Sequence, residues 1–233
     1  MALFTEQAAR ANVRNREGRR VFYLSEEDRL TPSAREWLRA EHIEILPAAE
    51  AKPKEYQTLF GAVLTEKPEH MTHLCGNTLV FKDHPRIAFR GQIDLLEAEL
   101  LLSRKTALEE KQTETARDLK EILDFTRLLL RADVLNEPVK ELRLCGLSES
   151  ELRARSHFPQ KYYGQPHFMP EAEDSRTLLQ LNRARAVTRQ AELACYRAFR
   201  DGNGLPTRED LILALNRLSS LLWILMIRLK AKE

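Results

Sequence analysis

The sequence predicts a mainly α protein, an up-and-down bundle of long helices preceded by a small mixed α+β module. Four of the helical segments in the second part of the chain exceed twenty residues, and strand signals there are scarce. Long helices joined by short connections are typical of bundles. With 233 residues, of which 43% are hydrophobic, the chain is long enough and apolar enough to bury such a core.

Residues 1–46 have a mixed pattern, which predicts the small α+β module. Two short helices and two short strands are expected, with the helices over residues 5–15 and from Thr31, and the strands over residues 20–24 and 43–45. Thr31 is a favourable N-cap because it directly precedes Pro32 at the first helical position. Residues 47–71 are rich in Ala, Lys, Glu and Pro, and this composition predicts a linker.

Residues 72–233 are expected to form the bundle domain. The apolar spacing predicts helices over residues 84–104, 107–133, 148–155, 172–201 and 207–230. The Gly202–Gly204 stretch and Pro206 separate the last two helices, and Thr207 is expected to cap the last one.

Charge and cysteine content narrow the class of protein. The net charge is only +2, which gives no case for a nucleic acid or a membrane surface as partner. Three widely spaced cysteines do not form a disulfide framework. The first residues lack the regions of a signal peptide, and the longest apolar run, Leu221–Ile227, is too short to span a bilayer. A cytoplasmic protein is therefore expected.

Three charged residues in the predicted helix over residues 172–201 share one face. Arg185, Arg189 and Glu192 lie at i, i+4 and i+7 within an apolar stretch. Buried arginines need anionic partners, so this face is either a ladder of structural ion pairs or a site for a polyanion. Asp94, near the start of the first long helix, is a candidate partner for Arg185.

The polar stretch before the first long helix is a second candidate site. It contains backbone amides, the hydroxyl of Thr72 and the cations of Lys82 and Arg86, all next to a helix N-terminus. Phosphates favour such a setting. Alone, this composition is more typical of an ordinary loop, since most loops of this composition bind nothing. The common nucleotide-binding fingerprints, the P-loop and G-x-G-x-x-G, are absent.

Residues 156–170 contain three prolines, two histidines and four aromatic side chains. This composition indicates either a ligand-contacting loop or a loop that packs on its own bundle. The spacing of histidines and cysteines matches no zinc motif, and no metal site is predicted. Asn216 and Arg217 interrupt a leucine stripe, and such a pair is typical of a contact that fixes helix register.

Taken in order, these segments resemble the cobalamin adenosyltransferases of the ethanolamine-utilisation type, within the wider propanediol-type superfamily. Thr72–Asp94 is similar to the pattern T-x-L…K-x-D-P-R…G-x-V-D-E-L, and Arg185–Glu192 to R-T-x-x-R-R-A-E. Ala214–Ser219 is similar to L-N-R-L-S. The ethanolamine branch is indicated by motifs at Leu30–Glu36, Leu130–Asp133, Gly146–Ser148 and the loop from Ser156 to Glu171.

The sequence also departs from the family. Members of this branch can carry a His followed by Cys-Cys-x-x-Cys before the position of Thr72, and this cluster binds a divalent metal. Residues 47–71 contain His70 but no cysteine, so no metal site carries over. Gln190 replaces the second arginine of R-R-A-E, and the N-terminal T-G-D-x-G loop is missing.

The resemblance implies transfer of the 5′-deoxyadenosyl group of ATP to cob(I)alamin, with ATP, cobalamin and Mg²⁺ as the ligands. Arg189 is then the expected triphosphate contact, and Lys82, Arg86 and Thr72 add to it. Glu192 and Asn216 are expected to hold the nucleotide, directly or through Mg²⁺. Asp94 and Arg185 are expected to form a buried ion pair that shapes the site.

The resemblance further implies an apolar side chain that displaces the lower ligand of cobalt, which makes Co(II) easier to reduce. Phe168 is the favoured residue, and Phe158 and Tyr162 are the other candidates. Family members form homotrimers with nucleotide sites between subunits, and a corrinoid reductase, an ammonia-lyase and a microcompartment are expected partners.

Two other functions remain open at this stage. The chain could be a non-catalytic chaperone that binds a corrinoid or nucleotide and delivers adenosylcobalamin. It could also be a structural bundle without a ligand.

Overall fold

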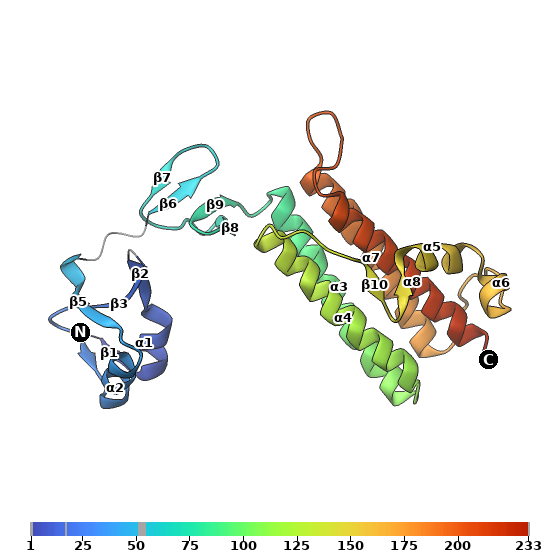
Figure 1. Cartoon of the computed structure of the whole chain (residues 1–233), viewed down its shortest axis with the longest axis horizontal. Coiled ribbons are helices and arrows are strands. Elements are labelled where there is room, and N and C mark those ends of the chain that lie inside the picture. Colours follow the sequence, from blue (N-terminus) through green and yellow to red (C-terminus); the bar gives the residue numbers. More distant parts are fainter. Residues whose placement is uncertain (1, 17, 51–54, 233) are drawn as a thin grey trace. The chain divides into compact units, whose positions relative to one another are not determined.

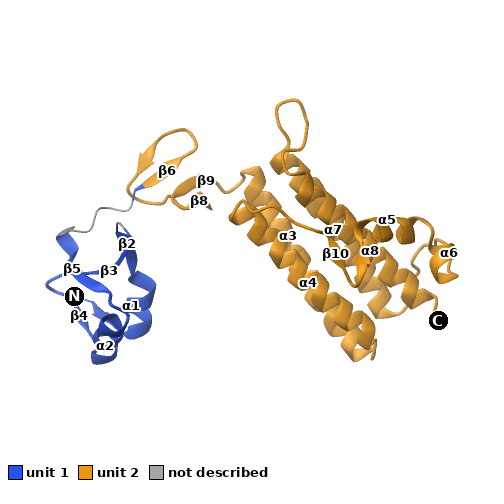
Figure 2. Ribbon diagram, in the orientation of Figure 1, with its two compact units in different colours: residues 1–55 blue, residues 56–233 orange. Residues whose placement is uncertain are grey.

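A computed structural model describes residues 2–16, 18–50 and 55–232 of the chain. They form two compact units, one over residues 1–55 and one over residues 56–233 (Figure 2). The first is a small α+β module, and the second contains a short sheet and a helical bundle (Figure 1). The predicted mainly α class with a small mixed module is confirmed.

The first unit combines two helices with short strands. In chain order its elements are β1 (Leu3–Phe4), α1 (Glu6–Asn12), β2 (Arg14–Arg16), β3 (Arg19–Leu24), β4 (Arg29–Leu30), α2 (Pro32–Ala40), β5 (Glu44–Pro47) and a 3₁₀ turn, η1 (Ala48–Glu50). Strand β3 pairs antiparallel with β2 and parallel with β5. As predicted, Thr31 caps α2, because its side chain accepts a hydrogen bond from the Ala34 N–H. Phe22 and Leu38 are fully buried in the core of this module.

The second unit begins with a four-stranded sheet in the order β7-β6-β9-β8. Its strands are β6 (Tyr56–Thr58), β7 (Val63–Leu64), β8 (Met71–Cys75) and β9 (Thr78–Phe81). Two of them, β6 and β7, lie inside the stretch 47–71 for which composition predicted a linker. The division between the compact units falls between residues 55 and 56.

The bundle is built from long helices that pack against their neighbours in sequence and also against helices distant in the chain. Its helices are α3 (Pro85–Glu109), α4 (Thr113–Val134), α5 (Glu149–His157), α6 (Pro159–Tyr163), α7 (Arg176–Phe199) and α8 (Glu209–Lys230). A small hairpin of β10 (Arg143–Leu144) and β11 (Leu147–Ser148) precedes α5. Helix α3 packs against both α4 and α7, and α7 packs against α8 (Figure 1).

Local capping explains where several helices begin. Ser148 and Glu151 form a capping box at α5, and the hydrogen bonds from Ser148 lower the pKa of Glu151 to about 2. Ser175 caps α7 by accepting from the Leu178 N–H. The predicted cap at Thr207 is wrong: α8 begins one residue later, and the Thr207 hydroxyl donates to the Phe199 carbonyl instead.

Helix α8 lies at the core of the bundle. Among the described residues it is the one helix long and apolar enough to cross a membrane, but 67% of that apolar stretch is buried inside the bundle. Leu218, Leu221 and Leu222 are fully buried there. Burial against neighbouring helices therefore accounts for the apolar character of α8.

Candidate functional site

One cavity of about 600 Å³ lies between α7, α8, the end of α5 and the segment that precedes α7. We call it the Trp223 cavity. Its lining residues are Ser156, His157, His167, Phe168, Met169, Pro170, Asn182, Arg185, Arg189, Ser219, Ser220 and Trp223. Aromatic side chains, hydroxyls and two cations thus meet in one space, and none of these lining residues is acidic.

The two arginines of the cavity stand one turn apart on α7. The Arg185 Nη2 donates to Asn182 Oδ1 at 3.2 Å, and its guanidinium lies 5.6 Å from the centre of the Trp223 ring. The buried Nε of Arg185 has no hydrogen-bond partner. Within the described residues, neither Arg185 nor Arg189 pairs with a carboxylate. Burial, and then the charge of Arg189, lower the pKa of Arg185.

This arrangement favours an anionic ligand. An arginine remains protonated at neutral pH even when its pKa is lowered. Two unneutralised cations in a partly buried wall repel each other, and a bound anion would relieve both the repulsion and the lost hydration. Of the two readings of the arginine face, the described contacts fit the polyanion site better than the ion-pair ladder.

The aromatic side of the cavity contains one of the three candidate wedge residues. Phe168 is half-buried and stacks on Trp223, with the ring centres 5.0 Å apart. Phe158 and Tyr162 are largely exposed and do not line the cavity. Tyr162 instead lies beneath Arg155 and Lys161 at the surface.

Glu192 and Asn216 are neighbours one turn beyond the cavity. The Asn216 Nδ2 donates to Glu192 Oε1 at 2.9 Å. The Asn216 Oδ1 accepts from buried Arg217, whose Nε donates to Glu149 at 3.2 Å. Asn216 and Arg217 therefore do tie α8 to its neighbours, and the Glu192 carboxylate is held beside the arginine face.

The structure does not bring Asp94 and Arg185 together within one chain, so the predicted ion pair is not formed there. Asp94 is exposed on α3 and makes no hydrogen bond or ion pair with the part of the chain that the structure describes. Arg185 faces the Trp223 cavity. The spacing of Asp94 in an apolar helix suggested burial, but the side chain lies on the solvent face of that helix.

The polar stretch before α3 lies away from the cavity. Thr72 is half-buried on β8, opposite Val80 of β9. Lys82 is exposed and pairs with Glu69 at 3.2 Å. Arg86 lies 5.3 Å from the Phe199 ring, and Phe199 is ten residues beyond Arg189 on α7, which corresponds to about 15 Å along the helix. Within one chain, these three residues and Arg189 do not meet.

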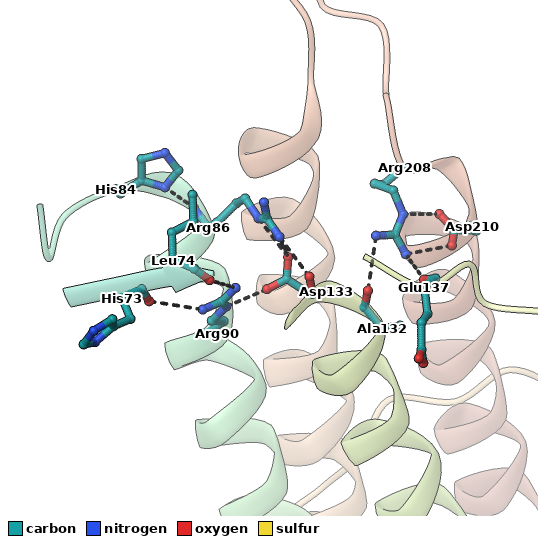
Figure 3. A network of polar contacts seen from close by, with 10 residues as sticks. All are labelled: His73, Leu74, His84, Arg86, Arg90, Ala132, Asp133, Glu137, Arg208 and Asp210. Carbon is teal, nitrogen blue, oxygen red and sulfur yellow. Dashed lines mark hydrogen bonds and ion pairs between the residues drawn. The ribbon is translucent and has the colours of Figure 1, made fainter. Parts of the chain in front are cut away.

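Arg86 is held instead by a buried carboxylate, Asp133 (Figure 3). The Arg86 Nε donates to Asp133 Oδ1 at 2.9 Å, and its Nη2 donates to the Asp133 carbonyl at 2.8 Å. Arg90 Nε donates to Asp133 Oδ2 at 2.5 Å, and Arg90 Nη2 donates to the Leu74 carbonyl at 2.9 Å. Asp133 is fully buried. We call Arg86, Arg90 and Asp133 the Asp133 cluster; it joins α3, α4 and β8.

Sequence reasoning missed Trp223 and Arg90 and gave Asp133 no role. Asp133 stands in the Leu130–Asp133 motif, so a signal for its importance was present, although not for its partners. Trp223 sits among leucines of a core helix, where an aromatic residue alone does not indicate a site.

Comparison with known proteins identifies the family of the chain. Residues 62–229 match the family model for cobalamin adenosyltransferase. The chain is 31% identical to the corrinoid adenosyltransferase EutT of Escherichia coli strain K12, over 98% of this chain and 92% of the relative. The protein of the same name from Salmonella typhimurium strain LT2 shows the same identity and coverage. The chain therefore belongs to the cobalamin adenosyltransferase family and is a transferase that acts on a corrinoid.

Proposed function

We propose that this enzyme transfers the 5′-deoxyadenosyl group of ATP to cob(I)alamin and so forms adenosylcobalamin. One observation supports the proposal above the others: Arg185 and Arg189 line a cavity without a carboxylate partner in the described chain. A triphosphate leaving group is the kind of anion that Arg189 would stabilise, while Arg185 stays available for a carboxylate of a neighbouring subunit.

The proposed reaction needs no nucleophile from the protein. Co(I) supplies both electrons of the new bond from cobalt to C5′ of ATP. The bond between C5′ and its ester oxygen breaks, and that electron pair leaves on the triphosphate. The protein's work is to align cobalt with C5′ and to stabilise the developing charge. Arg189, exposed at the cavity wall, is the residue we assign to that charge.

Glu192 and Asn216 are assigned to the nucleotide. The Glu192 carboxylate accepts one hydrogen bond from Asn216 and is half-buried beside the arginine face. Mg²⁺ is commonly bound by one or two carboxylates together with phosphate oxygens, so this oxygen donor fits the metal. Glu192 would hold Mg²⁺, which when bound adds positive charge at the triphosphate.

We further propose that the enzyme is a homotrimer with nucleotide sites between subunits. Thr72 and Lys82 lie far from Arg189 within one chain, and a neighbouring subunit would bring them together, whereas Arg86 is already held by Asp133. Helix α3 also exposes an apolar stripe on the side that includes Asp94, formed by Leu95, Leu101 and Leu102. Asp94, unpaired in the described chain, would then meet Arg185 of the partner subunit.

Phe168 is assigned to the reduction step. An apolar ring that displaces the lower cobalt ligand leaves Co(II) four-coordinate and easier to reduce. Phe168 is the one candidate that lines the cavity, whereas Phe158 and Tyr162 do not. The ethanolamine role, a cytoplasmic location, and a reductase, ammonia-lyase or microcompartment partner rest on the motif resemblance alone.

An anaerobic assay tests the proposal. The protein is mixed with ATP, Mg²⁺ and chemically reduced cob(I)alamin, and the visible spectrum of the corrinoid is followed. We expect conversion to adenosylcobalamin and one triphosphate released per turnover. Corrinoid binding without adenosylcobalamin formation would sink the enzyme proposal and favour the chaperone. Omitting ATP, or replacing it with GTP, is the matched control for the donor.

A further inference from the structure

Trp223 contacts side chains from several walls of the cavity. Ser219, Ser220 and Trp223 lie at i, i+1 and i+4 on α8, and all three line the cavity. The residues on either side of Trp223, Leu222 and Ile224, are fully buried in the bundle core. The indole is therefore carried by a rigid element, although the ring itself is half-buried and reaches the cavity.

Three side chains from other elements contact this one ring. Phe168 stacks on it at 5.0 Å with an interplanar angle of 26°, and His167 stacks on it at 5.8 Å with an angle of 6°. From α7, the Arg185 guanidinium lies 5.6 Å from the ring centre. Offset stacking and cation–π contacts of this kind fix orientation as well as contributing attraction.

The segment that carries Phe168 lacks such support of its own. Residues 165–171 form neither helix nor strand. Besides its stacking on Trp223, His167 makes a 3.3 Å polar contact between its Nε2 and the His157 carbonyl oxygen. Irregular segments are more mobile than the elements they connect. A ring that must take the place of a cobalt ligand has to be held within about 0.5 Å of its position.

We propose that Trp223 is the positioning residue for Phe168 and for the corrinoid that it contacts. The indole holds the Phe168 ring from the rigid side of the cavity and lies within contact range of the bound corrin. This inference rests on the proposed function. It differs from a simple core role for Trp223, which would affect folding and every step of turnover alike.

Turnover from two starting states separates those roles. Trp223→Leu keeps apolar volume but removes the ring, and Trp223→Phe keeps a smaller ring as the conservative control. Each variant is assayed from cob(II)alamin with a reductant and from pre-formed cob(I)alamin. We expect Trp223→Leu to lose about 10-fold more turnover in the first assay than in the second, and Trp223→Phe to recover most of that difference. Equal losses in the two assays would overturn the inference.

A double variant tests whether Trp223 acts through Phe168. If it does, Trp223→Leu adds little to the loss already caused by Phe168→Ala, and the two effects are not additive. Multiplicative losses would overturn the positioning role. Circular dichroism spectra and melting temperatures of all variants are compared, so that a folding defect is recognised; in that case Trp223→Phe carries the test.

Fluorescence provides a readout that does not depend on turnover. The chain has two tryptophans, and Trp37 lies in the separate N-terminal unit. Trp37→Phe therefore leaves Trp223 as the sole tryptophan, which is excited selectively at wavelengths that tyrosine does not absorb. Titration with cob(II)alamin should quench its emission by more than half, because the corrin absorbs where tryptophan emits. Free N-acetyltryptophanamide in the same titration corrects for absorption of light by the corrinoid.

The outcomes distinguish the two levels of the proposal. A wild-type protein that makes no adenosylcobalamin from cob(I)alamin refutes the proposed function; saturable quenching would then still support Trp223 as part of the corrinoid site. Normal turnover without quenching of Trp223 overturns the inference and leaves the proposed function standing.

Discussion

The arginines of the Asp133 cluster and those of the Trp223 cavity differ in their partners. In the Asp133 cluster, both Arg86 and Arg90 donate to a single buried carboxylate (Figure 3). In the Trp223 cavity, Arg185 and Arg189 face an open space, and no carboxylate pairs with either of them among the described residues. All four arginines come from α3 or α7, two helices that pack against each other.

The difference teaches that the partner, rather than residue type or burial, marks a binding arginine. Arg90 and Arg185 are both half-buried. Arg90 recovers its lost hydration from Asp133 and the Leu74 carbonyl, whereas Arg185 has one neutral acceptor and an unsatisfied Nε. The cost of an uncompensated cation is tolerated where a ligand or a neighbouring subunit supplies the missing anion.

Removing the carboxylate that Arg86 and Arg90 share should destabilise the fold. Asp133→Asn leaves Arg86 and Arg90 without an anion, and loss of one partner of a buried ion pair costs about 3–5 kcal/mol. We expect the free energy of unfolding to fall by that amount in urea titrations. The matched control is Asp124→Asn on the same helix, because Asp124 is exposed and pairs with Lys120. That change should cost less than about 1 kcal/mol. Similar losses in both variants would contradict a structural role for the cluster.

Arg189→Ala should lower turnover strongly without unfolding the protein. Loss of a group that stabilises leaving-group charge lowers kcat by about 100- to 1000-fold, or roughly 2.7–4 kcal/mol. Because Arg189 is exposed and has no carboxylate partner in the described chain, the melting temperature should stay close to that of the wild type. Arg183→Ala is a useful control, since Arg183 lies on the same helix but pairs with Glu99. A variant that loses its fold would place Arg189 with the structural arginines.

The contact between subunits can be sharpened by reversing its charges. Asp94→Arg should place like charges together at the proposed contact with Arg185 of the partner subunit and so weaken assembly. The double variant Asp94→Arg/Arg185→Asp should restore the trimer, with a coupling free energy of about 1.5 kcal/mol or more. Analytical ultracentrifugation at micromolar concentration measures both. A wild-type monomer, or no rescue by the double variant, would contradict the inter-subunit pair.

The helical fold was predictable because its signals are local. The spacing of apolar residues and the cap at Thr31 depend on neighbours in sequence, and the structure has helices at every predicted segment of the bundle. Boundaries were less secure: Thr207 was expected to cap α8, but its hydroxyl bonds to the end of α7. The short strands β6 and β7 pair with residues more than ten positions away or with each other, so composition suggested a linker instead.

The site was predictable in part for the same reason. Arg185 and Arg189 share a face by helical periodicity, and both do line the cavity. Asp94 was assigned to Arg185 because an acid in an apolar helix suggests burial, yet periodicity does not reveal which apolar face a helix turns to its own core. Asp133 lies 47 residues from Arg86, and a pair at that separation is fixed by tertiary packing.

The smallest expected effect concerns His84, at the edge of the Asp133 cluster. Its Nδ1 accepts a hydrogen bond from the Arg86 N–H at 3.2 Å and caps α3. Burial, and then the charges of Arg86 and Arg90, lower the pKa of His84. The unfolded chain therefore takes up a proton below about pH 6.5 while the native state is still neutral.

Stability should accordingly fall as the pH drops through about 6.5 and level off below the native pKa of His84. The loss is set by the difference between the pKa values of His84 in the unfolded and native states, and it should be the smallest of the predicted effects. His84→Asn keeps an acceptor at the cap but does not titrate, so it should remove this part of the pH dependence. Urea unfolding at pH 7.5 and pH 5.5 measures the difference between wild type and variant, in which the other titrating groups cancel. Parallel loss in both proteins would show that His84 is not the titrating group.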